Sequence, residues 1–165
     1  MKRLLALSIL FILSSCGMPD IRIKRKVDFS EVVGTWVLDP KSTAIAEDYD
    51  GDNFVPHPTK PHTITFNSDG TCHYRSVLQM PTRYVDTTGK WSITTDTKNP
   101  KVSKIQIELS EPTGKEYSFS LDFREESGHL IIWEFWSDPD LWNFLDYKRQ
   151  QTEQADAGNR RSAGA

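Results

Sequence analysis

Cysteine is scarce in this chain of 165 residues, which contains only Cys16 and Cys72. His73 and Arg75, whose charges could activate a thiolate, follow Cys72 in a run where apolar and polar residues alternate. Because alternate residues of a strand point to opposite faces, these two side chains turn away from the sulfur. We therefore expect Cys72 to be buried and unreactive, as lone cysteines most often are.

The sequence also lacks the motifs that usually mark an active site or a metal site. No G-x-S-x-G turn is present to expose a nucleophilic serine. Of the four histidines, only His57 and His62 lie close in the sequence, whereas zinc takes three or four ligands. Residues 48–52 alternate Asp as a calcium loop does, but Asn53 and Thr59 stand where the EF-hand pattern needs Gly and Glu. We therefore predict no enzyme activity, no metal and no cofactor.

No apolar run in the chain is long enough to cross a membrane as a helix. The longest, Leu4–Leu13, is interrupted only by Ser8, and a spanning helix needs about 20 residues. The basic pair Lys2 and Arg3 precedes this run. A basic flank before a short apolar run is typical of a signal peptide, so we assign residues 1–15 to a signal peptide and leave them out of the folded domain.

The stretch LSSC at residues 13–16 ends this leader. It resembles the bacterial lipobox, in which small residues precede an invariant cysteine. The resemblance implies that Cys16 is lipidated, with palmitate-type acyl chains that hold a cell-envelope lipoprotein in the membrane. Gly17 follows where Asp commonly retains such proteins at the inner membrane, which favours the outer membrane facing the periplasm. Lipidation of Cys16 leaves Cys72 without a disulfide partner.

Basic residues are too few for a nucleic-acid partner. Residues 1–15 hold two of the 20 Lys and Arg residues and none of the 23 acidic ones, so the rest of the chain carries a net charge of −5. Contact with phosphates needs an excess of Lys and Arg, and we exclude nucleic acid as a partner. A basic cluster at residues 22–26 follows the anchor. We interpret it as a solvated tether, with contact to anionic head groups as the alternative.

Composition divides the chain after the leader into three parts. Residues 16–27 form a lipidated tether, and residues 28–149 are dense in aromatic and β-branched residues. Residues 150–165 contain no large apolar residue. That tail cannot bury enough apolar surface to fold, and we expect it to be disordered, like the tether. The central part has the length of one domain.

Alternation of apolar and polar residues predicts strands through most of this domain. The runs lie at residues 33–38, 62–66, 71–75, 90–94, 104–109, 117–123, 129–136 and 143–149. Asp69-Gly70 predicts a hairpin turn, and further turns are predicted at residues 86–89 and 125–128. Consecutive antiparallel strands with short turns predict an all-β meander. Such a meander closes into a barrel or packs as a sandwich, because open strand edges invite aggregation.

The stretch VGTWVL at residues 33–38 resembles the first strand of the lipocalins and of small bacterial lipocalin-like lipoprotein domains, which carry Gly-x-Trp there. The Asp69-Gly70 turn and Gly89-Lys90-Trp91 follow in the order seen in those bacterial domains, while the lipocalin motifs of the loops are absent. The resemblance covers residues 31–149 and implies a calycin-type, lipocalin-like fold. That fold is a single antiparallel up-and-down β-barrel of about eight strands.

The same resemblance assigns structural roles at one end of the barrel. In these families the tryptophan of the first strand closes that end, and a basic residue of the last strand lies against it. Gly34 and Trp36 stand at the matching positions of the first strand. Arg149 is the corresponding basic residue, with its guanidinium expected to stack on the indole.

Aromatic residues are the remaining candidates for function. If the barrel binds a ligand, we predict that the ligand is small and apolar or amphipathic, and that the residues lining its site are Tyr74, Trp91, Phe119, Trp133 and Trp136. One alternative is a barrel filled by its own side chains. The other is a protein-binding module, either an envelope assembly factor or an inhibitor of a periplasmic enzyme. Such a module would use the 40–61 connection and an exposed tryptophan patch.

Overall fold

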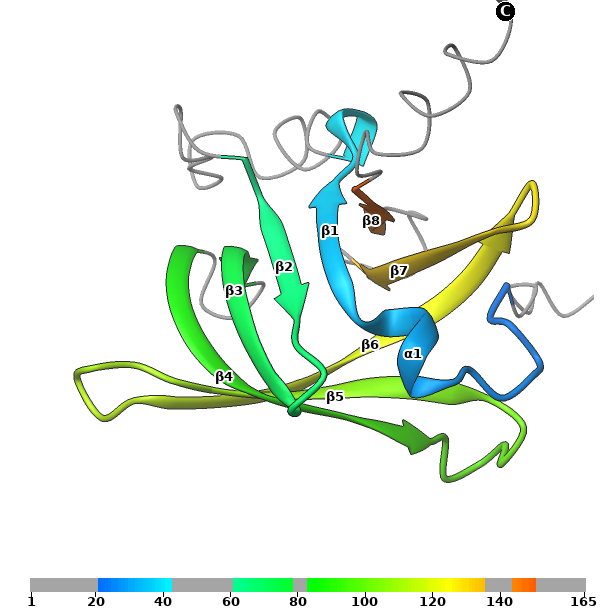
Figure 1. Cartoon of the computed structure of the whole chain (residues 1–165), viewed down its shortest axis with the longest axis horizontal. Helices are drawn as coiled ribbons and strands as arrows, with labels where there is room; N and C mark the ends of the chain where they lie inside the picture. Colours follow the sequence, from blue (N-terminus) through cyan, green and yellow to red (C-terminus); the bar gives the residue numbers. More distant parts are fainter. Residues whose placement is uncertain (1–20, 43–60, 79–82, 136–143, 151–165) are drawn as a thin grey trace, which may run out of the picture.

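The computed structural model describes residues 21–42, 61–78, 83–135 and 144–150, and they form one closed β-barrel (Figure 1). Each strand pairs antiparallel with the next strand in the chain, and the last pairs with the first. The strands are β1 (Gly34–Leu38), β2 (Thr63–Phe66), β3 (Thr71–Leu78), β4 (Arg83–Thr95), β5 (Ser103–Ser110), β6 (Glu116–Glu126), β7 (His129–Phe135) and β8 (Phe144–Arg149). The predicted antiparallel up-and-down barrel is confirmed, and the sandwich is not formed.

The hairpin of β2 and β3 has the turn that its sequence predicts. Gly70 adopts a φ of +83°, in the region that favours glycine. The Asp69 carboxylate accepts hydrogen bonds from the backbone N–H of Thr71 (2.9 Å) and from its hydroxyl (2.6 Å). The turn sets a register in which Ile64 lies opposite Tyr74, and both side chains are fully buried.

The turn predicted at residues 86–89 is wrong, because β4 runs through these residues without interruption. Gly89 lies inside this strand and pairs with Leu109 of β5. A Cβ atom at Gly89 would collide with the Glu108 carbonyl oxygen. The glycine therefore permits a close approach of two strands.

Alternation along each strand separates the barrel interior from its outer surface. In β5, for example, Ile107 and Leu109 are buried while Glu108 is exposed. The largest fully buried side chains of the interior are Trp36, Tyr74, Tyr147, Phe66 and Phe123. Close packing of such large side chains is what stabilises a domain of this size.

One end of the barrel is covered by a short helix, α1 (Phe29–Val32), which the sequence patterns do not predict. A capping box starts it: the Asp28 backbone N–H donates to the Glu31 carboxylate at 2.8 Å. The ring N–H of Trp36 donates to the Val32 carbonyl oxygen at 2.8 Å. We call this part of the barrel the α1 end. We call the opposite part, where β1 and β7 finish, the distal half (Figure 1).

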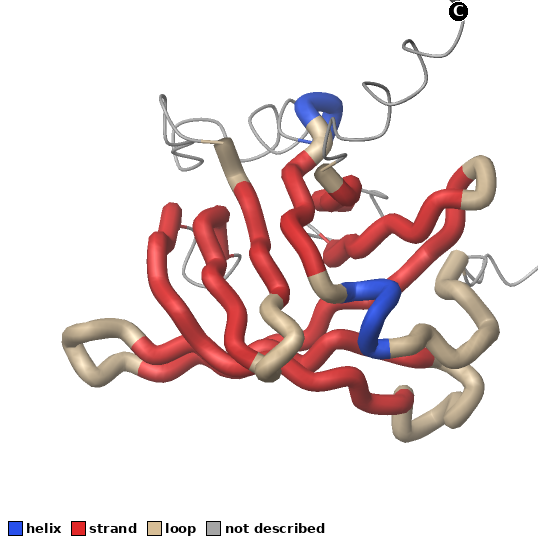
Figure 2. Tube along the Cα trace, in the orientation of Figure 1, coloured by secondary structure: helices blue, strands red, loops and turns tan. Residues whose placement is uncertain are grey.

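Residues 21–27 lie against the α1 end and lead into the helix as a loop (Figure 2). Ile23 and Val27 are buried in the core. The Ile23 N–H donates to the Phe123 carbonyl oxygen at 2.9 Å, and the Val27 N–H donates to the Ser103 hydroxyl at 3.1 Å. This part of the predicted tether is therefore ordered, and the folded domain begins earlier than predicted.

Some sequence predictions concern residues outside the described ranges and stay predictions. They concern the signal peptide with its lipobox and Cys16, the role of Trp136 as a residue lining a ligand site, most of the 40–61 connection, and the tail beyond Gln150. Within the described part of the chain, no helix combines the length and the apolar character needed to span a membrane.

Candidate functional site

Trp36 and Arg149 meet at the α1 end of the barrel. They lie opposite each other on β1 and β8, and the Arg149 guanidinium carbon is 5.2 Å from the centre of the Trp36 ring, within cation–π range. Arg149 also donates a hydrogen bond to the Glu31 carbonyl oxygen. Gly34, beside this guanidinium, has a φ of +135°, in the region that favours glycine. The contact expected between Trp36 and Arg149 is present, and it closes the barrel.

Trp91 is a second tryptophan at the α1 end, and packing surrounds it. Phe29 stacks on its ring with centres 4.3 Å apart and planes 14° apart. Phe66 lies 5.0 Å from it on another side, and the ring N–H donates to the Asn67 carbonyl oxygen at 3.0 Å. The side chain is 4% exposed. The structure thus places this predicted ligand residue among the contacts that close the barrel.

The other predicted ligand residues divide between the two faces of the barrel wall. Tyr74 and Phe119 meet inside the barrel, edge to face, with ring centres 5.5 Å apart. Trp133 lies on the outer face, where it packs edge-on against Phe135 and Phe144. Of the predicted ligand residues that the structure describes, only Tyr74 and Phe119 come together.

Beside Tyr74, the distal half holds a group of polar side chains in an otherwise apolar interior. The Nδ1 atom of His62 is 3.2 Å from the Ser76 hydroxyl, and that hydroxyl is 2.8 Å from the Tyr147 hydroxyl. The Tyr74 hydroxyl hydrogen-bonds with both of these hydroxyls. Glu134 of β7 adjoins the two tyrosines. We call His62, Ser76, Tyr74, Tyr147 and Glu134 the interior polar cluster.

Glu134 supplies the carboxyl group of the cluster. Its Oε1 atom is shielded from solvent and has no hydrogen-bond partner among the described residues. Alternation places Glu134 on the inward face of β7 with Ile132, and it lies opposite the buried Leu145. Burial raises the pKa of Glu134 to about 8, because the charged form loses its hydration. The carboxyl group is therefore largely neutral at pH 7.

The two tyrosines of the cluster remain protonated over the whole physiological range. Burial raises the pKa of the Tyr74 and Tyr147 hydroxyls well above the usual tyrosine value, and the nearby Glu134 carboxyl adds to the effect. Each hydroxyl can donate one hydrogen bond and accept others. The cluster therefore offers both donors and acceptors to a polar group placed beside it.

Two inward-facing side chains keep part of their surface accessible. Phe119 shares the inward face of β6 with the fully buried Leu121, yet Phe119 is only partly buried. Glu134 is likewise partly buried as a residue, although its Oε1 atom is shielded. Both side chains lie toward the distal end of the barrel, where β6 begins and β7 ends.

Two basic side chains of the neighbouring strands lie on the outer surface. Arg75 pairs there with Asp86 (3.3 Å), and Lys148 pairs with Asp39. A polar group beside the interior polar cluster would meet a carboxyl, hydroxyls and an imidazole.

Cys72 is buried on the inward face of β3, as its sequence context predicts. Burial raises the pKa of its thiol to about 11. Because only the thiolate is a strong nucleophile, Cys72 is unreactive at neutral pH.

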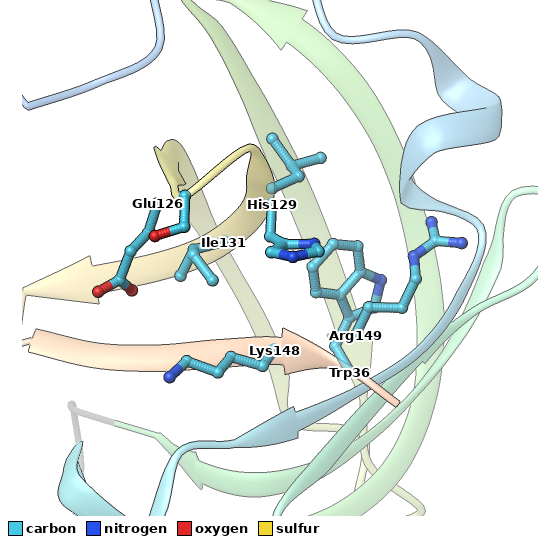
Figure 3. Close-up of a pocket in the computed structure, with 8 residues that line it drawn as sticks. Trp36, Glu126, His129, Ile131, Lys148 and Arg149 are labelled. Carbon is cyan, nitrogen blue, oxygen red and sulfur yellow. The ribbon is translucent and has the colours of Figure 1, made fainter. Parts of the chain in front are cut away.

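A separate surface pocket of about 530 Å³ lies at the α1 end (Figure 3). Its lining residues are Trp36, Glu126, Ser127, His129, Leu130, Ile131, Lys148 and Arg149. Figure 3 shows Lys148 and Arg149 pointing to opposite sides, and each already has a partner: Asp39 for Lys148, and the Glu31 carbonyl oxygen for Arg149. The pocket has the size of a small-molecule site, but both of its basic side chains are already paired within the protein.

Most of the interior polar cluster is absent from the sequence-based prediction, which contains Tyr74 alone. A signal existed for Glu134, the one acidic residue in the apolar run at residues 129–136, at an inward position shared with Leu130 and Ile132. His62, Ser76 and Tyr147 gave no such signal. They meet only because β2, β3 and β8 curve around one interior, and no local sequence pattern predicts that closure.

The comparisons with known proteins found no match for this chain. No family model matches the chain. Neither the curated proteins nor the solved structures include a match. The geometry of the barrel is therefore the basis for assigning a function.

Proposed function

We propose that this protein is a lipid-anchored lipoprotein of the cell envelope whose barrel binds a small amphipathic molecule without catalysis. The observation that carries the proposal is the interior polar cluster, with the shielded Glu134 oxygen and the partly buried Phe119 ring among the inward-facing side chains. Closed eight-stranded barrels either fill their interior or hold one small ligand. Polar groups that converge inside an apolar wall are typical of the second kind.

The wall and the cluster suit different parts of an amphipathic guest. Phe119 is partly buried and supplies aromatic surface, and burial of apolar area contributes about 25 cal/mol per Å². Glu134 and the hydroxyls next to it supply hydrogen bonds. A buried polar atom without a partner costs about 1–3 kcal/mol, so a guest that hydrogen-bonds to Glu134 removes that cost. The interior is thus complementary to a molecule with an apolar chain and a polar head.

Thr87 offers a way to block the interior and test this proposal. It is buried on the inward face of β4, opposite Tyr74. In Thr87→Trp the indole is placed on the inward face opposite Tyr74, where it should obstruct a ligand. Binding of decanol, measured by displacement of a neutral fluorescent apolar probe, should then fall at least about tenfold. Thr88→Trp, on the exposed face of the same strand, is the matched control and should bind normally.

Two results would overturn the binding proposal. One is that the unmodified chain does not bind the probe at all. The other is that Thr87→Trp binds it as tightly as Thr88→Trp while both variants keep their cooperative unfolding transition. Unfolding in urea is therefore recorded for both variants before the binding experiment.

The membrane anchor rests on the sequence of the leader and has its own test. Cells that express the chain are supplied with labelled palmitate, and the label should be incorporated through Cys16. Cys16→Ala should abolish labelling and release the protein from the membrane fraction. Cys72→Ala is the matched control and should be labelled normally. Continued labelling of Cys16→Ala would refute the lipoprotein assignment.

A further inference from the structure

We propose that the ligand of the barrel is a cationic amphiphile, an alkyl chain with a primary ammonium group, and that the ammonium binds at Glu134. This inference rests on the proposed function and names the class of ligand. The interior polar cluster holds acceptor groups from three strands: a shielded carboxyl oxygen on β7 and hydroxyls on β3 and β8. A primary ammonium carries three donors and no acceptor, so it is complementary to such a cluster.

The Glu134 carboxyl disfavours the opposite head group. A carboxylate ligand would lie beside a second carboxyl group, and like charges in one site disfavour each other. An ammonium ion reverses this effect, because it favours the ionised form of the carboxyl and forms a charge-assisted hydrogen bond with it.

Three further titratable groups belong to the same cluster as the carboxyl. Tyr74 on β3 and Tyr147 on β8 stay neutral, since burial keeps the pKa of each hydroxyl high. His62, ahead of β2, already shares a hydrogen bond with Ser76. Glu134 is therefore the group in this cluster that changes its charge when an ammonium arrives, and binding at pH 7 should release a proton from it.

The test compares three probes with the same chain length: decylammonium, decanol and decanoate. Their affinities for the purified full-length chain are measured by titration calorimetry, below the critical micelle concentration of each probe. Decylammonium should bind at least about tenfold more tightly than decanoate, which corresponds to about 1.4 kcal/mol. In Glu134→Gln this preference should fall to about threefold or less, while decanol binding stays within about threefold.

A matched variant separates Glu134 from the general negative charge of the chain. Glu108→Gln makes the same change on the exposed face of β5 and should keep the full preference for decylammonium. Equal affinity for decylammonium and decanoate would overturn the inference but leave the binding function standing. So would a preference that survives in Glu134→Gln. Failure of all three probes to bind would overturn the proposed function itself.

Discussion

The α1 end and the distal half belong to the same eight strands, but they satisfy their buried polar groups differently. At the α1 end, the ring N–H groups of Trp36 and Trp91 and the guanidinium of Arg149 each donate to a backbone carbonyl oxygen. In the distal half, the Glu134 Oε1 atom is shielded and has no such partner among the described residues.

This difference is the basis on which we propose a structural role for the α1 end and a binding role for the distal half. Groups that the chain itself satisfies add to stability, whereas a buried carboxyl oxygen without a partner lowers it. Natural sequences accept such local costs mainly at functional sites. Trp36 and Trp91 therefore hold the fold together, and the proposed site rests on the less conspicuous Glu134.

Trp36→Ala is expected to be the most damaging change at the α1 end. It removes a ring that is fully buried and hydrogen-bonded to Val32, and such truncations cost about 3–5 kcal/mol. Urea unfolding, followed by the fluorescence of the remaining tryptophans, measures the loss. Trp36→Phe should recover part of it by keeping an aromatic ring. A loss below about 1 kcal/mol for Trp36→Ala, in the range of ordinary surface changes, would contradict its role in closing the barrel.

Glu134→Gln should remove a pH dependence of stability. The sign of this dependence is opposite to that of a carboxylate whose pKa is lowered by folding. The pKa of Glu134 is raised from 4.5 in the unfolded chain to about 8 in the fold. Its protonation therefore favours the folded state fully below pH 4.5, and this contribution is lost as the pH rises toward 8.

The expected size is a few kcal/mol, at up to about 1.4 kcal/mol per pH unit. Urea unfolding between pH 5 and pH 8 should show the unmodified chain losing stability relative to Glu134→Gln as the pH rises. Glu108→Gln, a change at an exposed site, should run parallel to the unmodified chain. Parallel curves for Glu134→Gln would mean that the carboxyl is not desolvated.

Arg149→Lys should weaken the α1 end more than a surface substitution does. The planar guanidinium both stacks on Trp36 and reaches the Glu31 carbonyl oxygen, and an ammonium on a flexible stem cannot do both. We expect a loss of about 1–2 kcal/mol in urea unfolding. Lys148→Arg, next to it on the outer face, is the control and should be near neutral. An Arg149→Lys variant as stable as the unmodified chain would show that the stacking has no energetic role.

Phe29→Ala should have the smallest effect of this series. The Phe29 ring is 40% exposed, and its main contact is the stack on Trp91, a type of contact that contributes about 0.5–1.5 kcal/mol. The emission of Trp91 should shift to longer wavelength as water reaches its ring. Ser30→Ala is the neighbouring control. An unchanged emission spectrum would show that Phe29 does not shield Trp91.

The strands could be predicted from the sequence because their signals are local. Alternation in β5 and β6 and the Asp69-Gly70 turn depend on neighbouring residues only, and each was found in the structure. Gly89 was misread for a physical reason. A glycine that permits two strands to approach and a glycine that permits a turn are the same residue, and only the pairing of β4 with Glu108 of β5 distinguishes them.

The site could not be predicted in the same way, because it depends on closure of the barrel. Ser76 and Tyr147 come within 2.8 Å of each other although β3 and β8 are not neighbours in the sheet. Aromatic content pointed to Trp91 and Trp133, which are conspicuous in the sequence. One packs at the α1 end and the other on the outer face, since size and hydrophobicity do not tell which side of a wall a residue occupies.

The central claim is that a ligand binds beside Glu134 in the distal half and not at the α1 end. Titration of the isotope-labelled chain with decylammonium, followed by amide and indole N–H signals in two-dimensional NMR, tests it directly. We predict that the backbone signals of Ser76, Glu134 and Tyr147 shift and saturate, while the indole signals of Trp36 and Trp91 stay in place. Shifts confined to His129, Leu130 and Arg149 around the α1-end pocket would contradict the account.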